Sequence, residues 1–600
     1  MNLSDYILEF LRKKRVYNVF TITGGAICFL MDAFSRDNKI KYTTVAHEQA
    51  AAMMADSYSR FGPNFSATMV TSGPGATNLL TGIACSWFDS IPSLHICGQV
   101  NRYELSSFDK STKKVRQVGF QETDIVSMAR PITKFTYQLK NENEIRYILE
   151  KAYYISQEGR PGPVLIDIPM DLQRKIINPN KLKSFKPKKN KINNKKLSKQ
   201  INEILSFLKK SKRPVIILGG GIRISKTIKE LNLFLKKFNI PIVTTWSGVD
   251  AINHDHKNYI GNIGVYGSRS ANFVIQNSDF VLSLGSRLDT RITGGVPKNF
   301  AREAVIASVD VDKDELNKDR GLRIKIKINE SLTSFFNDFK KKSKSLRINK
   351  PEWMHRSLLW KERYPIVLQK YRVQKKYVNP YFFMEKLSKY LAKDDIVVAD
   401  DGAHLTWAIQ SLRVLKQQRL FSAFGNSPMG YAFPAAIGAS IALNKKKIIC
   451  IDGDGSIQIN IQELQTLVSN KLPIKIIILN NQGYGIIKQF QELYLRERHE
   501  AVDPRKGVTN PNFSKVANAY GINYSEIKNN SDIDKILKKT IRSKKAEFIN
   551  IFTKPDQKII PKLAFGSPLE DLSPQLPRKE FLENMIIQTI DKNKNLTESN

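Results

Sequence analysis

The stretch CIDGDGSIQINIQELQTLVSNKLPIKIIILNN, residues 450–481, contains two apolar runs that each end in oxygen-bearing side chains. The first run leads into Asp452-Gly453-Asp454-Gly455, and the second leads into Asn480-Asn481. A short segment with helical character separates them, so the stretch predicts a β–α–β unit with parallel strands. Because parallel strands end at one edge of a sheet, we expect Asp454 and Asn481 to lie close together.

Asp454 and Asn481 offer the ligand types that a hard divalent cation prefers. Mg²⁺ binds oxygen atoms and usually keeps phosphate oxygens in its coordination shell. Gly453 and Gly455 permit a tight turn and let a phosphate approach the backbone. Either motif alone also fits an ordinary acidic turn or strand exit. The pair, separated by 27 positions in one β–α–β unit, predicts a metal–diphosphate site.

The alternation of strand-like and helix-like segments predicts an α/β fold with three doubly wound parallel-sheet domains. A chain of 600 residues is too long for a single hydrophobic core. The predicted domains span residues 1–175, 198–345 and 377–560, with a basic linker at 176–197, a connector at 346–376 and a tail lying over the surface at 561–600.

The composition argues against a nucleic-acid-binding, disulfide-stabilised or membrane protein. The chain has 95 Lys and Arg against 56 Asp and Glu, but the lysines are spread throughout. The run KLKSFKPKKNKINNKK (181–196) is better explained as a solvated linker than as a nucleic-acid site. The four cysteines show no CxxC pairing, which predicts reduced thiols. Without a signal peptide or an apolar run long enough to span a bilayer, the sequence predicts a cytoplasmic protein that binds neither nucleic acid nor membrane.

The GDG and NN pair resembles the signature of enzymes that use thiamine diphosphate. Further motifs occur in the order found in the catalytic subunit of the acetohydroxyacid (acetolactate) synthase family. They are TGGA (23–26), AHEQAA (46–51), TSGPGATN (71–78), FQETD (120–124), RPGPVLIDIP (160–169), LGGG (218–221) and LGSRLDTRITG (284–294). The resemblance implies a pyrimidine-binding domain, a central flavin-binding-like domain and a diphosphate-binding domain, in that order. It implies decarboxylation of a 2-oxoacid, with pyruvate expected, and transfer of the two-carbon unit to an acceptor.

The resemblance also implies which residues hold thiamine diphosphate. Mg²⁺ would bind Asp454, Asn481 and the backbone carbonyl of Gly483. Met429 would support the bent form of the cofactor, although a buried Met is otherwise simply part of a core. The loops around the diphosphate would use Gly402, Ala403, His404, Gly453, Gly455 and Ser456.

Glu48 is the first candidate for proton transfer. It precedes AAAMMA, an apolar setting that disfavours a charged carboxylate. From its position alone, the simpler role of a helix-dipole partner is favoured. The family resemblance instead implies that Glu48 hydrogen-bonds the aminopyrimidine of the cofactor, with Gly25 and Gln121 in the same pocket.

A second cofactor is expected in the central domain. Three glycines after a predicted strand are weak evidence for a phosphate site. SRLDTR resembles the flavin-contacting segment of the family, which implies FAD in a structural rather than a redox role. The implied FAD-binding residues are Gly219, Gly220, Gly221, Thr245, Gly285, Arg287, Asp289, Arg291 and Asp310.

Departures from the family pattern all lie on the acceptor side. Met170 stands where the family usually has Lys, and Phe490 replaces a Trp; with Ile486 these form the expected acceptor pocket. Arg116 and Gln117 replace smaller neighbours of Gln121. Two acceptors therefore stay open, a second 2-oxoacid and a nucleotide-linked ketosugar. A pyruvate-oxidase-like flavoprotein and a basic binding protein without catalysis are weaker alternatives.

The predicted assembly follows from the positions of Glu48 and Asp454 in different domains. In the resembling family, one cofactor lies between the first domain of one subunit and the third domain of another. A homodimer is therefore the smallest expected assembly, and a tetramer or a small regulatory subunit is left open.

Overall fold

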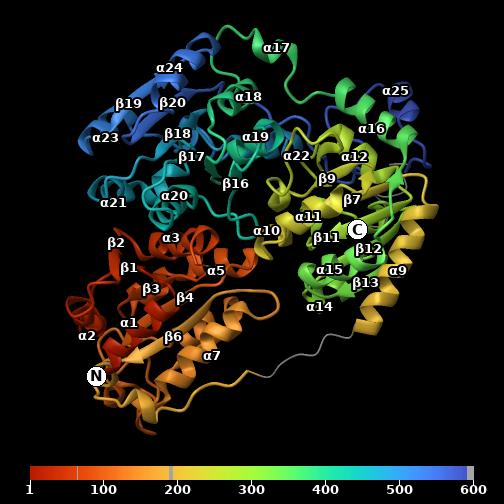
Figure 1. Cartoon of the computed structure of the whole chain (residues 1–600). Coiled ribbons are helices and arrows are strands. Elements are labelled where there is room, and N and C mark those ends of the chain that lie inside the picture. The colour runs from red at the N-terminus through yellow and green to blue at the C-terminus, as the bar shows by residue number, and fades with distance from the viewer. Residues whose placement is uncertain (64, 188–193, 591–600) are drawn as a thin grey trace.

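The computed structural model describes residues 1–63, 65–187 and 194–590. Within them lie three parallel sheets of six strands, each with helices on both faces (Figure 1). Part of the predicted basic linker, residues 188–193, lies outside the described residues. In Figure 1 the first unit is red to orange, the central unit is yellow to green, and the third is teal to blue.

The first unit has the strand order β2-β1-β3-β4-β6-β5. The strands β3, β4 and β6 are buried along their whole length, as expected for a parallel sheet covered on both faces. The strands are β1 (Asn18–Ile22), β2 (Lys41–Thr44), β3 (Ala67–Val70), β4 (Leu94–Gln99), β5 (Phe135–Gln138) and β6 (Val164–Pro169). The main helices are α1 (Leu3–Lys13), α3 (Glu48–Phe61), α5 (Leu80–Asp89) and α7 (Ile145–Gln157), and α8 (Met170–Gln173) follows the last strand of this sheet.

The central unit has the order β10-β9-β7-β11-β12-β13. This order matches the dinucleotide-binding sheet, in which the chain reverses direction between two central strands, here β7 and β11. The strands are β7 (Pro214–Leu218), β9 (Ile242–Thr244), β10 (Tyr259–Asn262), β11 (Phe280–Leu284), β12 (Val305–Asp310) and β13 (Ile324–Asn329). The main helices are α9 (Asn194–Lys210), α11 (Ile228–Leu235), α12 (Arg269–Gln276) and α15 (Leu332–Lys342), and β8 (Phe238–Asn239) pairs separately with β14 (Ile348–Asn349).

The third unit has the order β16-β15-β17-β18-β20-β19, which is the connectivity of the first unit. The strands are β15 (Ile396–Ala399), β16 (Arg419–Phe421), β17 (Ile448–Gly453), β18 (Lys475–Asn480), β19 (Asn523–Ile527) and β20 (Glu547–Phe552). The main helices are α18 (Pro380–Tyr390), α19 (Ala403–Ser411), α20 (Ala432–Ala442), α22 (Gly485–Tyr494), α23 (Phe513–Ala519) and α24 (Ile533–Thr540). In both units the chain reverses direction between the first and third strands, so both present a binding edge there.

The C-terminal tail is more deeply packed than expected. Helix α16 (Pro351–Arg363) of the connector and helix α25 (Arg578–Glu583) of the tail lie against the central unit (Figure 1). Leu563, Leu569 and Leu572 are buried in one core with tryptophans of α16. The sequence predicted a tail on the surface because its prolines hide the spacing of these leucines. The tail is instead part of the central core.

The first and third units meet through α3 and α20 (Figure 1). Asp56 of α3 is fully buried and accepts hydrogen bonds from Arg60, Ser86 and Tyr431. Tyr431 comes from the third unit, so this network crosses the interface. Gly438 of α20 has no room for a side chain, because an added Cβ would lie 2.2 Å from the carbonyl oxygen of Met54.

Three of the four cysteines are buried, whereas Cys28 is exposed, and all are free thiols. No helix among the described residues combines the length and apolar content needed to cross a membrane.

We predict that Gly438→Ala destabilises the contact between the first and third units. The added methyl group meets rigid backbone, and overpacking of this kind costs about 1–3 kcal/mol. Thermal unfolding should show a lower midpoint than the native chain. Gly295→Ala is the matched control, because an added Cβ there has no heavy atom within 4 Å. Equal midpoints for the two variants would contradict the packing argument.

Candidate active site

The binding edge of the third sheet is built around the ends of β15 and β17. These strands pair in parallel, so the residues after them lie side by side. Asp400 follows β15 and accepts hydrogen bonds from the N–H groups of Gly430 (2.7 Å) and Ala432 (2.6 Å). The Asp400 carboxylate thereby fixes the loop that carries Met429 at the same edge.

His404 lies in the first turn of α19 beside two glycines that leave space for its ring. An added Cβ would lie 2.6 Å from the ring at Gly402 and 2.8 Å from it at Gly453. Burial lowers the pKa of His404 to about 3, so the imidazole is neutral. Its buried Nε2 has no partner among the described residues. A buried ring nitrogen without a partner fits a ligand that is not part of the chain.

Asp400, Asp452 and His404 could themselves hold a metal, since one ligand atom of each lies within 4.8 Å of the others. Both oxygens of Asp400 and Oδ1 of Asp452 already have protein partners, however, whereas Asp452 Oδ2 has none among the described residues. Asp452 accepts hydrogen bonds from Ser456 and from the N–H group of Gly453. We therefore interpret this group as the support of the diphosphate loops.

The stronger candidate metal site lies around Asp454, two residues after Asp452. Asp454 is buried, and its Oδ2 accepts hydrogen bonds from the Gly483 N–H group (3.1 Å) and from Asn510 (2.6 Å). If its nitrogen faces them, the Asn481 amide donates to Asp454 Oδ1 (3.3 Å) and to the Gly483 carbonyl (2.9 Å). In the other orientation three oxygens converge without a donor. These three oxygens are the ligands predicted for Mg²⁺, and their convergence fits a cation.

Asn510 is a site residue that the sequence did not indicate. It lies far along the chain from the GDG and NN motifs, and no spacing rule points to it. Gln458 donates to the Asn510 side chain (2.9 Å) and to the Asp454 carbonyl (3.0 Å), so the two amides hold Asp454 in one orientation.

The first sheet gathers Gly25, Glu48 and Gln121 at its own binding edge. Gly25 follows β1, Glu48 begins α3 after β2, and Asn78 after β3 donates to Glu48 Oε2 at 2.9 Å. Gln121 has a φ of 65° and packs against Gly73, where an added Cβ would lie 2.9 Å from the Gln121 side chain. The three predicted residues thus share one edge, and their roles stay predictions.

Within one chain Glu48 does not bond to the expected metal and diphosphate residues. In the described part of the chain, no hydrogen bond or ion pair connects Glu48 with Asp454, Asn481 or His404. Glu463 instead accepts the N–H groups of Ala46 and His47 (both 3.0 Å) just before α3.

A cavity of about 1000 Å³ opens at the reversal point of the central sheet. The ends of β7 and β11 approach closely there, since an added Cβ on Gly219 would lie 2.2 Å from the Gly285 carbonyl oxygen. Gly219 therefore allows β7 and β11 to approach each other closely. It does not line the cavity, although it was among the predicted FAD-binding residues. The predicted FAD residues that do line the cavity are Gly220, Gly221, Thr245, Gly285, Arg287, Asp289, Arg291 and Asp310.

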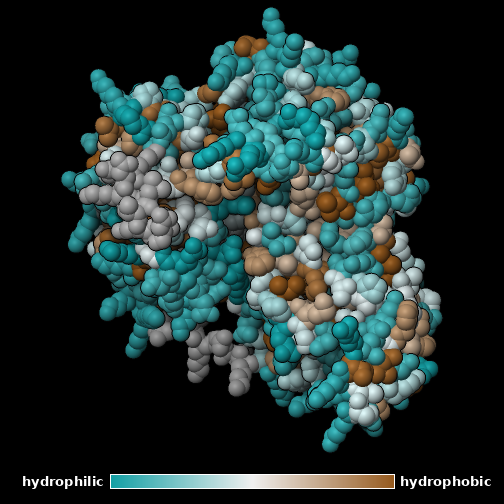
Figure 2. Space-filling view, turned by 180° about the vertical axis from the view of Figure 1, so that it is seen from behind, coloured by the Kyte–Doolittle hydropathy of each residue, from teal (hydrophilic) through white to brown (hydrophobic). Residues whose placement is uncertain are grey.

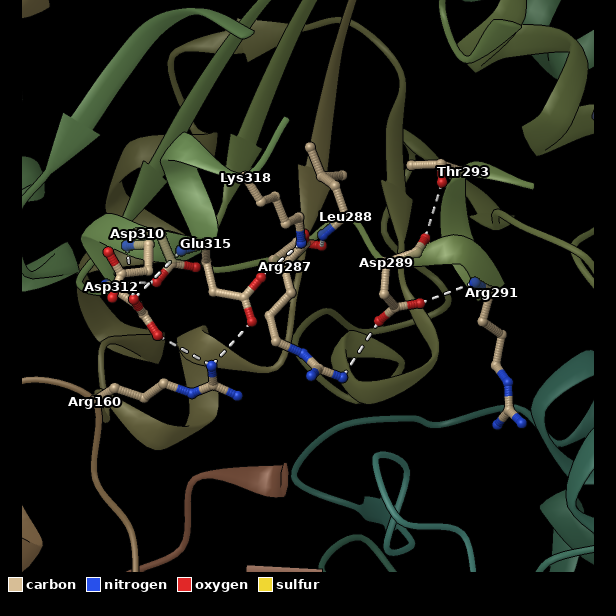
Figure 3. Close-up of polar contacts among 12 residues, drawn as sticks. Arg160, Arg287, Leu288, Asp289, Arg291, Thr293, Asp310, Asp312, Glu315 and Lys318 are labelled. Carbon is tan, nitrogen blue, oxygen red and sulfur yellow. Dashed lines mark hydrogen bonds and ion pairs between the residues drawn. The ribbon is translucent and has the colours of Figure 1, made fainter. Parts of the chain in front are cut away.

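Arg160 also lines this cavity, although the sequence did not indicate it. It reaches from the first unit to Asp312 (3.1 Å) and Glu315 (3.0 Å) of the central unit. Figure 3 shows Arg287 and Asp289 facing each other between Arg160 and Arg291, with Arg291 pointing toward the third unit. Arg160 begins the motif RPGPVLIDIP (160–169), which could have marked it as a candidate residue.

The predicted acceptor residues divide between two units. Ile486 and Phe490 lie on α22, which begins two residues after Gly483. Phe490 packs against Tyr494 and against Phe565 of the tail. Met170 begins α8 in the first unit.

Comparison with known proteins gives an independent test. Models of the thiamine pyrophosphate enzymes match residues 1–128 (N-terminal TPP binding domain), 201–335 (central domain) and 400–551 (C-terminal TPP binding domain). The acetolactate synthase large subunit of Cyanidium caldarium is 33% identical over 93% of this chain and 94% of its own length. The chain belongs to this family of thiamine pyrophosphate enzymes.

Two bacterial members of the family are also similar. The acetolactate synthase large subunit of Lactococcus lactis is 32% identical over 94% of both chains. The isozyme 2 large subunit of Escherichia coli is 29% identical over 90% of this chain and 94% of its own. The predicted fold and the thiamine-diphosphate-dependent carboligase class are confirmed by these matches.

We predict a pH-dependent penalty from Asp454 in the cofactor-free protein. Burial raises its pKa to about 7, whereas an unfolded Asp has a pKa of about 4. The folded protein therefore binds the extra proton between these values, and stability falls as the pH rises through them. Asp454→Asn removes this penalty, so the difference in melting temperature between variant and native chain should grow from about pH 5 to about pH 8.

Asp556→Asn, at an exposed surface carboxylate, is the control for this measurement. A difference for Asp454→Asn that stays constant across the pH range would contradict the assignment.

Proposed function

We propose that the chain decarboxylates pyruvate and joins the two-carbon unit to a second 2-oxoacid, forming an acetolactate-type product. The observation that carries this proposal is the convergence of Asp454, Asn481 and the Gly483 carbonyl at the sheet edge where His404 Nε2 lacks a partner. The similarity to acetolactate synthase large subunits over most of the chain favours a 2-oxoacid over a nucleotide-linked ketosugar as acceptor.

In this proposal the third unit holds Mg²⁺ and the diphosphate of the cofactor. The three oxygens at Asp454, Asn481 and Gly483 bind the cation, and the neutral His404 ring and the Gly402 and Gly453 turns receive the diphosphate. When bound, thiamine diphosphate supplies the electron sink for decarboxylation. The chain supplies orientation and a buried environment.

Glu48 is proposed to exchange a proton with the pyrimidine ring. Its carboxylate lies at the start of α3 and is oriented by Asn78 at 2.9 Å. Gly25 and Gln121 at the same edge would contact the reacting groups. A positioned carboxylate of this kind contributes about 10²–10⁴-fold to a rate.

We propose FAD as the ligand of the central cavity. A volume of about 1000 Å³ at the reversal point of a dinucleotide-binding sheet suits a ligand of this size. Arg287 and Arg291 offer cations to the diphosphate or the ring system. Because the proposed carboligation involves no net oxidation, the flavin would act structurally.

A homodimer is proposed as the catalytic unit, because Glu48 and Asp454 lie on separate edges within one chain. Large apolar side chains near Gln121 are exposed in the single chain, with Phe120 84% exposed. Figure 2 shows several hydrophobic patches in the right half of the view, where the first and third units lie. The relatives are named large subunits, so we also propose a smaller partner subunit.

We predict that Glu48→Gln and Asp454→Ala each abolish most product formation, and that co-expression of the two variants restores activity. Half of the randomly formed dimers are mixed. In each mixed dimer one site has native Glu48 from one chain and native Asp454 from the other, whereas the second site carries both substitutions. Random pairing should therefore restore about a quarter of native activity. Acetolactate formation from pyruvate, with thiamine diphosphate and Mg²⁺, is measured by mass spectrometry.

Co-expression of Glu48→Gln with itself under a second tag is the control, and it should stay inactive. An active monomer, or no recovery in a verified mixed dimer, would contradict the shared site. No product from the native chain would overturn the proposed function.

We also predict that Arg287→Glu weakens FAD binding at least tenfold, since it places a carboxylate in the cavity near the expected diphosphate. Flavin fluorescence titration measures the affinity. Lys210→Glu makes the same charge change at the end of α9, outside the cavity lining, and should leave the affinity unchanged. Equal affinities for all three proteins would rule out this role for Arg287.

A further inference from the structure

A connector of three residues, 45–47, joins β2 to α3 and leads directly into Glu48, the proposed proton-transfer residue. Its first N–H group donates to a carbonyl of β1 at 3.1 Å and so continues the sheet. The other two N–H groups, those of Ala46 and His47, both donate to Oε1 of Glu463 at 3.0 Å. All three N–H groups of the connector are therefore paired, two of them with one carboxylate oxygen.

Glu463 belongs to the third unit, where it ends the short 3₁₀ helix η9 (Ile457–Glu463), and it is 0% exposed. Its second carboxylate oxygen accepts a hydrogen bond from the Thr466 hydroxyl (2.7 Å). No lysine or arginine in the described part of the chain forms an ion pair with it, and burial raises its pKa. A polar group is tolerated in such a place when its hydrogen-bonding capacity is used. Glu463 uses most of its capacity on the connector of the first unit.

Helix η9 also supports the expected metal ligand. Near its start, Gln458 donates to the Asp454 carbonyl (3.0 Å). In its middle, the amide nitrogen of Asn460 lies 3.7 Å from the sulfur of Met53 in α3. Glu463 stands at its end. The same short segment therefore supports the metal site and the start of α3.

The contacts of the Glu48 side chain do not fix its backbone. Asn78 donates to Oε2 (2.9 Å), and Oε1 lies beside Gly75, where an added Cβ would be 3.6 Å away. The His47 ring caps the helix by accepting the N–H group of Gln49 (3.1 Å). The position of this first turn is thus set by the connector, and a misplacement of about 1 Å in a reacting group can cost about 10²-fold in rate.

We propose that Glu463 is a positioning residue for Glu48, and this inference rests on the proposed carboligation. The reach of its side chain determines where the connector ends and where α3 begins. The role is that of a hydrogen-bond acceptor of the right length, because the described contacts of Glu463 are with two N–H groups and one hydroxyl and include no cation.

Two variants separate reach from charge. Glu463→Gln keeps the length and one acceptor oxygen without the charge, whereas Glu463→Asp keeps the charge but withdraws both oxygens by about 1.5 Å. We expect the kcat of Glu463→Gln to stay within about twofold of the native value and that of Glu463→Asp to fall roughly ten- to hundredfold. The KM for pyruvate should change less than about threefold in both, since only the proton-transfer group moves. Acetolactate formation gives these values.

Hydrogen–deuterium exchange of residues 45–50, followed by mass spectrometry on the cofactor-free protein, is a readout that does not depend on activity. We expect faster exchange in Glu463→Asp and native exchange in Glu463→Gln, because the connector N–H groups lose their acceptor only in the shorter variant. Ser86→Ala is the matched control. It removes a buried hydrogen bond to Asp56 (2.9 Å), further along α3, and should leave both kcat and this exchange unchanged.

An active Glu463→Asp variant beside an inactive Glu463→Gln variant would overturn the inference, because the charge would then be the required property. Native exchange of residues 45–50 in Glu463→Asp would overturn it too, as would an equal loss of kcat in Ser86→Ala. Failure of the native chain to form product would count against the proposed function, and the exchange comparison would still decide whether Glu463 holds the connector.

Discussion

The buried carboxylate of Asp454 is the constraint on which the site depends. It lies just past β17, at the point where the third sheet reverses, with an amide and a carbonyl oxygen beside it. A buried negative charge is stable only when it is paired or coordinates a metal. Gln458 and Asn510 orient Asp454 but bring no positive charge. This arrangement supports the proposed cation, which would neutralise Asp454 and anchor a phosphate at the sheet edge.

The first and third units have the same strand order, but different side chains lie at their binding edges. The edge of the third sheet has oxygen ligands and a neutral imidazole, whereas the edge of the first has Glu48 beside glycine-rich turns. In one chain, α3 and α20 pack the units together, and no hydrogen bond joins Glu48 to Asp454, Asn481 or His404 among the described residues. The exposed apolar side chains near Gln121 fit a second copy that would bring complementary edges together.

The central unit and the tail determine what surrounds this machinery. The strand order of the central sheet leaves a cavity of about 1000 Å³ beyond the ends of β7 and β11. The tail adds leucines to the core of the same unit and brings Lys562 and Phe565 to α22. The surroundings of α22 are thus assembled from segments that are distant in sequence.

The sequence by itself determined the three parallel sheets and the closeness of Asp454 to Asn481. These features are local, because strand, turn and ligand lie within one β–α–β unit and the periodicity of apolar residues reveals them. The contact of Asn510 with Asp454 and the ion pairs of Arg160 with the central unit could not be found in this way. Each residue reaches its partners across a distance in sequence that no spacing rule covers, and only the packing of whole units brings them there. The buried tail was missed for the same reason, since its leucines acquire a core only when the connector helix and the central sheet are both in place.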